Sequence, residues 1–131
     1  MKGSFDNSQP IFRQIIDQIL LEIASGELAP GAKVASVREL ALEYKVNPNT
    51  MQKSLSKLEE MGYMYTERTS GRYVTGDTAL IENLKSRLPA RLTEKYIDEM
   101  MECGIGVNDI PEYVIRISEN HVDNRAENRR L

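Results

Sequence analysis

The chain contains very little cysteine or histidine. Cys103 and His121 are each the only residue of their type. A single cysteine excludes an internal disulfide and any metal site made of several cysteines, and we expect its thiol to be buried or at an interface. His121 has no evident nucleophile or metal partner, so we expect a surface histidine. The glycines form no phosphate-binding pattern. The sequence therefore predicts no enzyme, no metal site and no cofactor.

Long apolar runs are also absent. The sequence has no apolar run of eighteen residues and no basic leader followed by an apolar stretch. We therefore expect no membrane partner and a cytoplasmic location. At 131 residues, 40% hydrophobic and 28% charged, the chain is typical of a globular protein with one domain, or a small domain plus an appendage.

A strong excess of positive charge is the third absence, since the net charge is −3. The distribution along the chain is uneven: residues 33–72 hold seven basic and five acidic side chains. Binding to DNA requires a local basic face and not a basic protein. The charge therefore permits a nucleic-acid partner.

Residues 36–58 have the pattern of two short helices joined by a tight turn. Ser36 followed by Glu39 is a capping box, which predicts the start of the first helix. Asn47 is suited to cap the second helix, and Pro48 to occupy its first position, where a missing N–H costs nothing.

The second of these helices has two contrasting faces. Its apolar residues recur at helical spacing and should face inward: Met51, Leu55, Leu58 and Met61. The outward residues are Asn49, Gln52, Lys53, Ser56 and Lys57, with no acid before Glu59. A face of amides, hydroxyls and lysines suits a DNA major groove. The alternative is an ordinary helical hairpin with a solvated face.

The flanking segments favour the DNA-binding interpretation. Before the two helices at 36–58, a further helix is predicted from Pro10 to about Ser25, followed by a short strand at 33–34. After it, residues 63–68 and 72–74 are predicted to form a β-hairpin. This order is that of a winged helix-turn-helix, in which the hairpin is the wing. Its tip would carry Arg68, Thr69, Ser70, Gly71 and Arg72, where a glycine lets the backbone approach a phosphate. Such a tip can also be an ordinary polar turn.

The pattern changes after residue 76. A long helix is predicted over about 77–103, with a kink or break at Pro89, and Asn108 is predicted to cap a final helix. Apolar stripes on these helices predict a dimer interface made of Leu80, Leu84, Leu88, Leu92, Ile110, Val114 and Ile117. We expect residues 120–131 to be disordered. The predicted domains are therefore a DNA-binding domain at 1–76 and a helical dimerisation or effector region at 77–131.

Residues 10–74 resemble the DNA-binding domain of the GntR family of bacterial transcription regulators. The resemblance is carried by the SGEL-x-PG turn, the SVREL segment, the VNPNT helix start and the wing glycine. The short two-helix tail is similar to that of the YtrA-type subgroup. The resemblance implies a mainly α fold with a small β-hairpin, and a homodimer that binds a palindromic operator in double-stranded DNA, usually as a repressor. Genes of the subgroup often lie beside genes for ABC transporters.

The resemblance also implies a set of DNA-contacting residues. These are Arg38, Asn47, Asn49, Thr50, Gln52, Lys53, Gly71 and Arg72. Arg68 is added because it lies at the predicted tip of the wing. The sequence departs from the family pattern in three places: Ala35 replaces a usual proline, Gln52 replaces a common arginine, and Thr69-Ser70 replace a more basic wing tip. A glutamine favours an adenine-type contact over a guanine-type one.

Two other functions are open at this point. A protein-binding winged helix would predict acidic or apolar residues at Asn49, Lys53 and Arg72, and the sequence has none there. Alternatively, the C-terminal helices could act as a lid that senses a small molecule instead of forming a dimer. Tyr96, Met100, Met101 and Tyr113 could then line a hydrophobic cleft, although such residues at helical spacing are also typical of a core.

Overall fold

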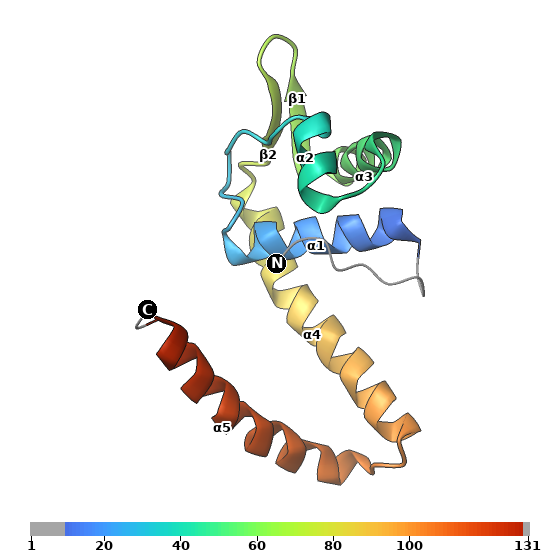
Figure 1. The fold of residues 1–131 in the computed structure, drawn as a ribbon, viewed down its shortest axis with the longest axis vertical. Coiled ribbons are helices and arrows are strands. Elements are labelled where there is room, and N and C mark those ends of the chain that lie inside the picture. Colours follow the sequence, from blue (N-terminus) through green and yellow to red (C-terminus); the bar gives the residue numbers. More distant parts are fainter. Residues whose placement is uncertain (1–9, 130–131) are drawn as a thin grey trace. The chain divides into compact units, whose positions relative to one another are not determined.

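The computed structural model describes the backbone of residues 10–129 and the side chains of residues 10–121. It confirms a mainly α fold with one small β-hairpin (Figure 1). The elements, in chain order, are α1 (Ile11–Ser25), α2 (Val37–Tyr44), α3 (Pro48–Glu60), β1 (Met64–Glu67), β2 (Gly71–Val74), α4 (Thr78–Glu102), the 3₁₀ turn η1 (Val107–Asp109) and α5 (Ile110–Arg129). They form two compact units, which divide between Leu88 and Pro89.

The helix-turn-helix begins and turns where the local sequence predicts. The Ser36 hydroxyl accepts a hydrogen bond from the Glu39 N–H at 3.1 Å, and α2 begins at the next residue. The Asn47 side chain accepts from the Asn49 N–H at 2.7 Å, with Pro48 as the first residue of α3. Each cap satisfies a backbone donor that the helix itself leaves unpaired. Both predicted helix starts are confirmed.

The core of the first unit lies between α1 and α3. Three isoleucines of α1 at four-residue spacing are at most 1% exposed: Ile15, Ile19 and Ile23. Met51, Leu55 and Leu58 of α3 are fully buried against this core, as predicted. Met61 is 40% exposed, so its predicted inward orientation is wrong. It follows the last residue of α3, where the helical periodicity no longer determines which way the side chain faces.

The wing is a two-stranded antiparallel hairpin in which Met64 pairs with Val74 and Glu67 with Gly71. The predicted strand at 33–34 is present as a single bridge between Lys33 and Tyr73. Backbone hydrogen bonds tie this segment to β2, since the Val34 N–H donates to the Arg72 carbonyl at 2.9 Å. The segment that leads into α2 is therefore paired along β2.

Helix α4 contributes to both compact units. Ile81 is 3% exposed and Leu84 is fully buried, and both belong to the core of the first unit. The two compact units therefore divide at 88/89, whereas the boundary at 76/77 between a DNA-binding domain and a helical region stays a prediction. Pro89 lies inside a continuous helix, so the predicted break is absent.

The second unit has little core of its own. Helix α4 is followed by Gly104 in a left-handed conformation (φ 89°). Asn108 lies within η1 and α5 begins at Ile110, so the predicted cap is not formed there. Helix α5 continues to Arg129 where disorder was predicted, and residues 130–131 lie outside the described part. Among the described side chains of this unit, Ile110 alone is buried.

Candidate nucleic-acid interface

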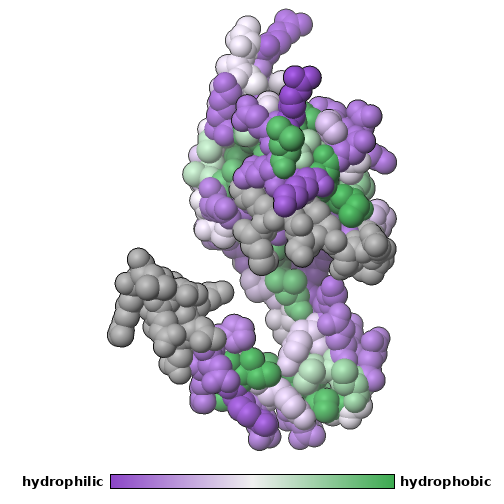
Figure 2. Space-filling view, in the orientation of Figure 1, coloured by the Kyte–Doolittle hydropathy of each residue, from purple (hydrophilic) through white to green (hydrophobic). Residues whose placement is uncertain are grey.

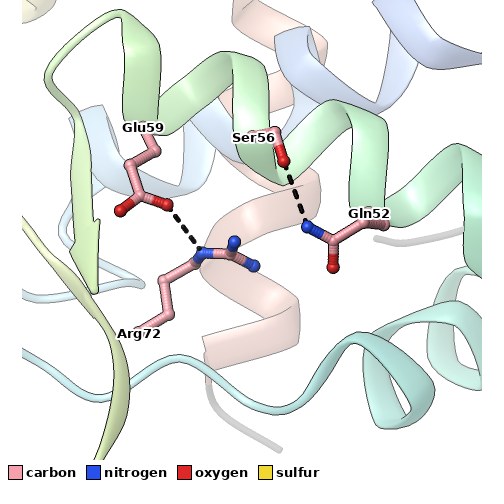
Figure 3. A network of polar contacts seen from close by, with 4 residues as sticks. All are labelled: Gln52, Ser56, Glu59 and Arg72. Carbon is pink, nitrogen blue, oxygen red and sulfur yellow. Dashed lines mark hydrogen bonds and ion pairs between the residues drawn. The ribbon is translucent and has the colours of Figure 1, made fainter. Parts of the chain in front are cut away.

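The outer face of α3 is polar and exposed, as the sequence predicts. Its exposed side chains are Asn49, Gln52, Lys53, Ser56 and Lys57. The Gln52 amide donates to the Ser56 hydroxyl at 3.1 Å, one turn along the helix (Figure 3). This bond restrains the glutamine side chain against α3 and leaves its carbonyl oxygen as an acceptor. The face can therefore present both donors and acceptors to base edges.

Two other predicted DNA-contacting residues near the start of α3, Asn47 and Thr50, already use some of their polar groups in hydrogen bonds within the protein. The Asn47 carbonyl oxygen is used in the helix cap, so its amide nitrogen remains as a donor. Thr50 is half-buried, and its backbone carbonyl accepts from the buried Ser54 hydroxyl at 2.9 Å. Asn49 is exposed, and the cap bond it makes uses its backbone only. At this end of the helix Asn49 has the most freedom to reach DNA.

Two exposed cations are candidates for phosphate contacts, one on the face of α3 and one on α2. The Lys53 ammonium lies 5.0 Å from the centre of the Phe12 ring, a cation–π contact between α3 and α1. Arg38 is exposed in the first turn of α2. A cation there is repelled by the positive N-terminal end of the helix dipole. A bound anion would offset this repulsion. A DNA phosphate is an anion of that kind.

The two arginines of the wing have different environments. Arg68 is exposed in the turn that joins β1 and β2. The Arg72 side chain is only 17% exposed, and its Nε donates to a Glu59 carboxylate oxygen of α3 at 3.4 Å. Arg72 was predicted at the free tip of the wing. The structure instead places it beside α3 (Figure 3).

A groove of about 720 Å³ separates the wing from the start of α2. Its walls include Lys33, Ser36, Thr66, Ser70, Gly71 and Arg72. Gly71 has a φ of 118°, and a Cβ there would lie 3.3 Å from the Cε atom of Lys33. The glycine therefore lets the lysine stem cross the wing backbone. The hydrophilic character of the hairpin end is visible in Figure 2.

Lys33 is a site residue that the sequence reasoning missed. Its backbone bridge to Tyr73 carries it to the edge of the wing. The predicted strand at 33–34 was a signal of this position, but the strand's pairing partner was not evident from local sequence. Because the side chain lines the groove, its ammonium adds positive charge between the wing and α2.

A buried pair supports the position of α2 and was also missed. Glu22 of α1 is 3% exposed and Tyr44 of α2 is 2% exposed. The tyrosine hydroxyl donates to a Glu22 carboxylate oxygen. Burial, followed by this hydrogen bond, raises the pKa of Tyr44 far above its ordinary value. A glutamate within the isoleucine-rich face of α1 was the available sequence signal.

The predicted dimer residues fall into two groups. Leu84 and Ile110 are buried within the chain, and Leu80 and Leu88 pack half-buried against the core of the first unit. This corrects the predicted interface for Leu84 and Ile110, because their burial does not require a second chain. The other three are exposed to 45–55%: Leu92, Val114 and Ile117.

The C-terminal unit contains a shallow groove of about 350 Å³. It is lined by Tyr96, Tyr113, Val114, Ile117, Ser118 and His121. The two tyrosines of the predicted cleft therefore share a groove, whereas Met100 and Met101 are not among its lining residues. His121 is exposed, as predicted. Cys103 is also exposed and not buried within the chain.

The described part of the chain holds no group of three or more histidine, cysteine or acidic residues that could bind a metal ion. No helix in that part is long and apolar enough to span a membrane.

Comparison with known proteins connects this geometry to a family. Residues 12–74 match the family described as bacterial regulatory proteins, gntR family. The transcriptional regulator YhcF of Bacillus subtilis is 35% identical over 91% of this chain and 98% of its own length. The transcriptional repressor YtrA of the same organism is 34% identical over 86% of this chain and 87% of its own length.

A solved structure extends the similarity to the arrangement of the backbone. The GntR family transcriptional regulator from Listeria monocytogenes is 42% identical, with a TM-score of 0.76, over 86% of this chain and 98% of that chain. The winged helix-turn-helix and the two C-terminal helices thus both have counterparts in known regulators. The chain belongs to the GntR family of helix-turn-helix transcriptional regulators, a family of DNA-binding proteins and not of enzymes, and YtrA is among its relatives.

Proposed function

We propose that the protein is a cytoplasmic, sequence-specific repressor that binds a palindromic operator as a homodimer. The observation that carries the proposal is the exposed face of α3, which bears amides, hydroxyls and lysines and has no acidic residue between Pro48 and Lys57. Helices of this position in a helix-turn-helix read base edges with residues near their N-terminus. Asn49 and Gln52 would supply that contact.

Phosphate contacts would fix the protein on the duplex. Arg38 of α2, Lys53 of α3 and Arg68 of the wing turn are exposed, and Lys33 lines the groove beside the wing. Such contacts supply affinity that depends on salt but not on sequence. Because phosphate contacts do not depend on sequence, base contacts would account for the discrimination between operator and other DNA.

The dimer is proposed from the C-terminal unit. Leu92, Val114 and Ile117 are about half exposed, and Met101, Val107 and Ile115 add further exposed apolar surface. Hydrophobic residues are visible on the surface of this unit in Figure 2. Burial of each large side chain contributes roughly 1.5–3 kcal/mol, which favours covering these faces with a second copy.

The experiment that tests the function is selection of bound duplexes from a random-sequence pool by the full-length protein. We expect a palindromic site. Gln52→Ala should relax one position symmetrically in each half-site, because loss of a bidentate base contact costs about 1–3 kcal/mol. Asn83→Ala, which removes an exposed amide of α4, is the matched control and should leave the site unchanged. An enriched pool without any common site would refute the proposal.

A second candidate is a lid that senses a small molecule. It is favoured by the groove between Tyr96 and Tyr113, which overlaps the proposed dimer face at Val114 and Ile117. Sedimentation of the intact protein separates the two possibilities. A dimer at micromolar concentration supports the first, and a monomer that still binds a palindrome supports the lid.

A further inference from the structure

One ion pair joins the wing to α3, and it uses a defined edge of the arginine side chain. The Nε atom of Arg72, on β2, lies 3.4 Å from a carboxylate oxygen of Glu59, in the last turn of α3. The two side chains are 17% and 33% exposed, so water screens this pair less than a pair on an open surface. No other ion pair joins the wing to α3 among the described residues.

The contact uses only the inner edge of the guanidinium. An arginine has five N–H donors in a planar fork, and the bond to Glu59 occupies the Nε donor. The two terminal nitrogens extend past Glu59 toward the side on which Gln52 lies (Figure 3). The described residues provide these nitrogens with no hydrogen-bond partner. The outer edge therefore remains able to donate two parallel hydrogen bonds.

We propose that Glu59 is a positioning residue that orients Arg72 so that its outer edge donates to an acceptor of the bound duplex. The inference rests on the proposed DNA-binding function. The acceptor is a base edge, which accepts paired hydrogen bonds from a guanidinium, and a phosphate oxygen is the alternative that the test separates from it. Glu59 does not contact DNA in this arrangement, and its effect on binding passes through Arg72.

The charge of Glu59 makes this role distinguishable from simple repulsion. A carboxylate beside DNA weakens binding to every sequence, so its removal alone should strengthen non-specific binding. Removal of a positioning carboxylate should instead lower selectivity, because Arg72 then samples several rotamers and no longer points in a fixed direction. The ratio of the dissociation constant for mixed-sequence DNA to that for the selected site separates these effects.

The chain offers a matched control at the next residue. Glu60 is also in the last turn of α3, but it is 71% exposed and pairs with Lys57 at 3.4 Å on the same helix. Glu59→Gln and Glu60→Gln remove the same charge from adjacent positions. The test compares both variants with the wild type by titrating a duplex selected from a random pool and a mixed-sequence duplex of equal length.

We expect Glu59→Gln to lower the selectivity ratio about tenfold, out of a ratio of about 10³ or more for a specific regulator. Glu60→Gln should leave the ratio within about twofold. In an Arg72→Ala background, Glu59→Gln should have no further effect, since the residue on which it acts is absent. If Glu59→Gln behaves like Glu60→Gln, or acts equally in both backgrounds, the proposal is overturned.

A second variant keeps the proposal testable even if Glu59→Gln is unstable. Arg72→Lys retains the charge, but a lysine has no second edge, so it cannot keep the pair with Glu59 and also form a bidentate contact. It should lower the ratio as much as Glu59→Gln does. A wild-type ratio for Arg72→Lys would also overturn the proposal.

The same variant distinguishes the two acceptors. If Arg72 reads a base, sites selected by Arg72→Lys should lose one position in each half-site. If it binds a phosphate instead, the selected site should persist and the affinities for the selected and the mixed-sequence duplex should fall together, which leaves the ratio unchanged and overturns the proposal. Should the wild type show no selectivity, the proposed function fails, and this outcome is distinct from failure of the Glu59 inference alone.

Discussion

The two compact units of this chain bury their apolar residues to very different extents. Residues up to Leu88 enclose a core of seventeen buried hydrophobic side chains drawn from helices α1 to α4 and the wing. In the second unit, Leu92, Ile115 and Ile117 are each more than half exposed. Both segments have amphipathic sequences, so apolar periodicity alone does not decide whether a face is covered within its own chain. The number of neighbouring elements decides it.

This contrast assigns different tasks to the two units. A unit with a complete core can hold side chains of α2, α3 and the wing in fixed positions, as sequence-specific DNA binding requires. A unit with uncovered apolar faces favours association. The proposed function uses both properties, because two readers joined in a dimer bind a palindrome far more tightly than one reader alone.

Truncation should give the largest effect and tests where the first unit ends. A fragment ending at Leu88 keeps Ile81 and Leu84 in the core, whereas one ending at Gly76 loses both. At about 1.5–3 kcal/mol for each buried side chain, the shorter fragment should be less stable by about 3–6 kcal/mol. Urea unfolding of the two fragments measures this difference. Equal midpoints would place the boundary at 76/77 after all.

Two leucines of α4 provide a matched pair for the next prediction. Leu84 is fully buried and Leu92 is 55% exposed. Leu84→Ala should lower the free energy of unfolding by about 2–5 kcal/mol, because it leaves a cavity. Leu92→Ala should change that of the isolated chain by less than about 0.5 kcal/mol.

For self-association the order should be reversed, with the larger effect from Leu92→Ala. Leu92→Ala should weaken the dimer, as measured by sedimentation over a range of concentrations, while Leu84→Ala should leave the association of the folded fraction unchanged. An effect of Leu92→Ala on unfolding but not on association would argue for an intramolecular partner.

Removal of the Tyr44 hydroxyl should have an intermediate effect, confined to the first unit. Tyr44→Phe deletes a hydrogen bond to the buried Glu22 carboxylate and should cost about 1–3 kcal/mol at neutral pH. The raised pKa of Tyr44 also predicts a pH dependence. The folded state keeps its proton above the ordinary tyrosine pKa of about 10 while the unfolded state loses it, so stability should fall as pH rises past that value.

The alkaline part of this prediction has its own control. In Tyr44→Phe the contribution of this residue to the decline above pH 10 should disappear, whereas Tyr65→Phe, at a residue 41% exposed on β1, should preserve it. Chemical denaturation at pH 8 and pH 10.5 measures the difference. Identical slopes for all three proteins would show that Tyr44 does not determine the pH dependence.

The smallest expected effect concerns a single phosphate contact. Arg38→Ala should weaken binding to all sequences alike and lower the salt slope by about one unit per half-site. Arg91→Ala removes an exposed arginine from the C-terminal unit and should leave the slope unchanged. Titrations at several salt concentrations measure both slopes. Equal slopes for Arg38→Ala and the wild type would make Arg38 an ordinary surface residue.

Features that depend on neighbouring residues were predictable from the amino-acid sequence. Ser36 and Asn47 start α2 and α3 because each side chain bonds a backbone N–H only two or three residues away. Gly104 follows α4 in a left-handed conformation. The outward face of α3 follows from helical periodicity within one element. Such features were predictable because their physical causes are local.

Contacts between side chains far apart in the sequence became evident only in the folded chain. Glu22 contacts Tyr44 across 22 residues, and Glu59 pairs with Arg72 of the wing. Leu84 and Leu92 lie on the same apolar stripe of α4, but only Leu84 meets the core of the first unit. Periodicity shows that a face is apolar but does not identify what covers it. Burial and ion pairing depend on how elements far apart in the sequence pack together, which no local pattern encodes.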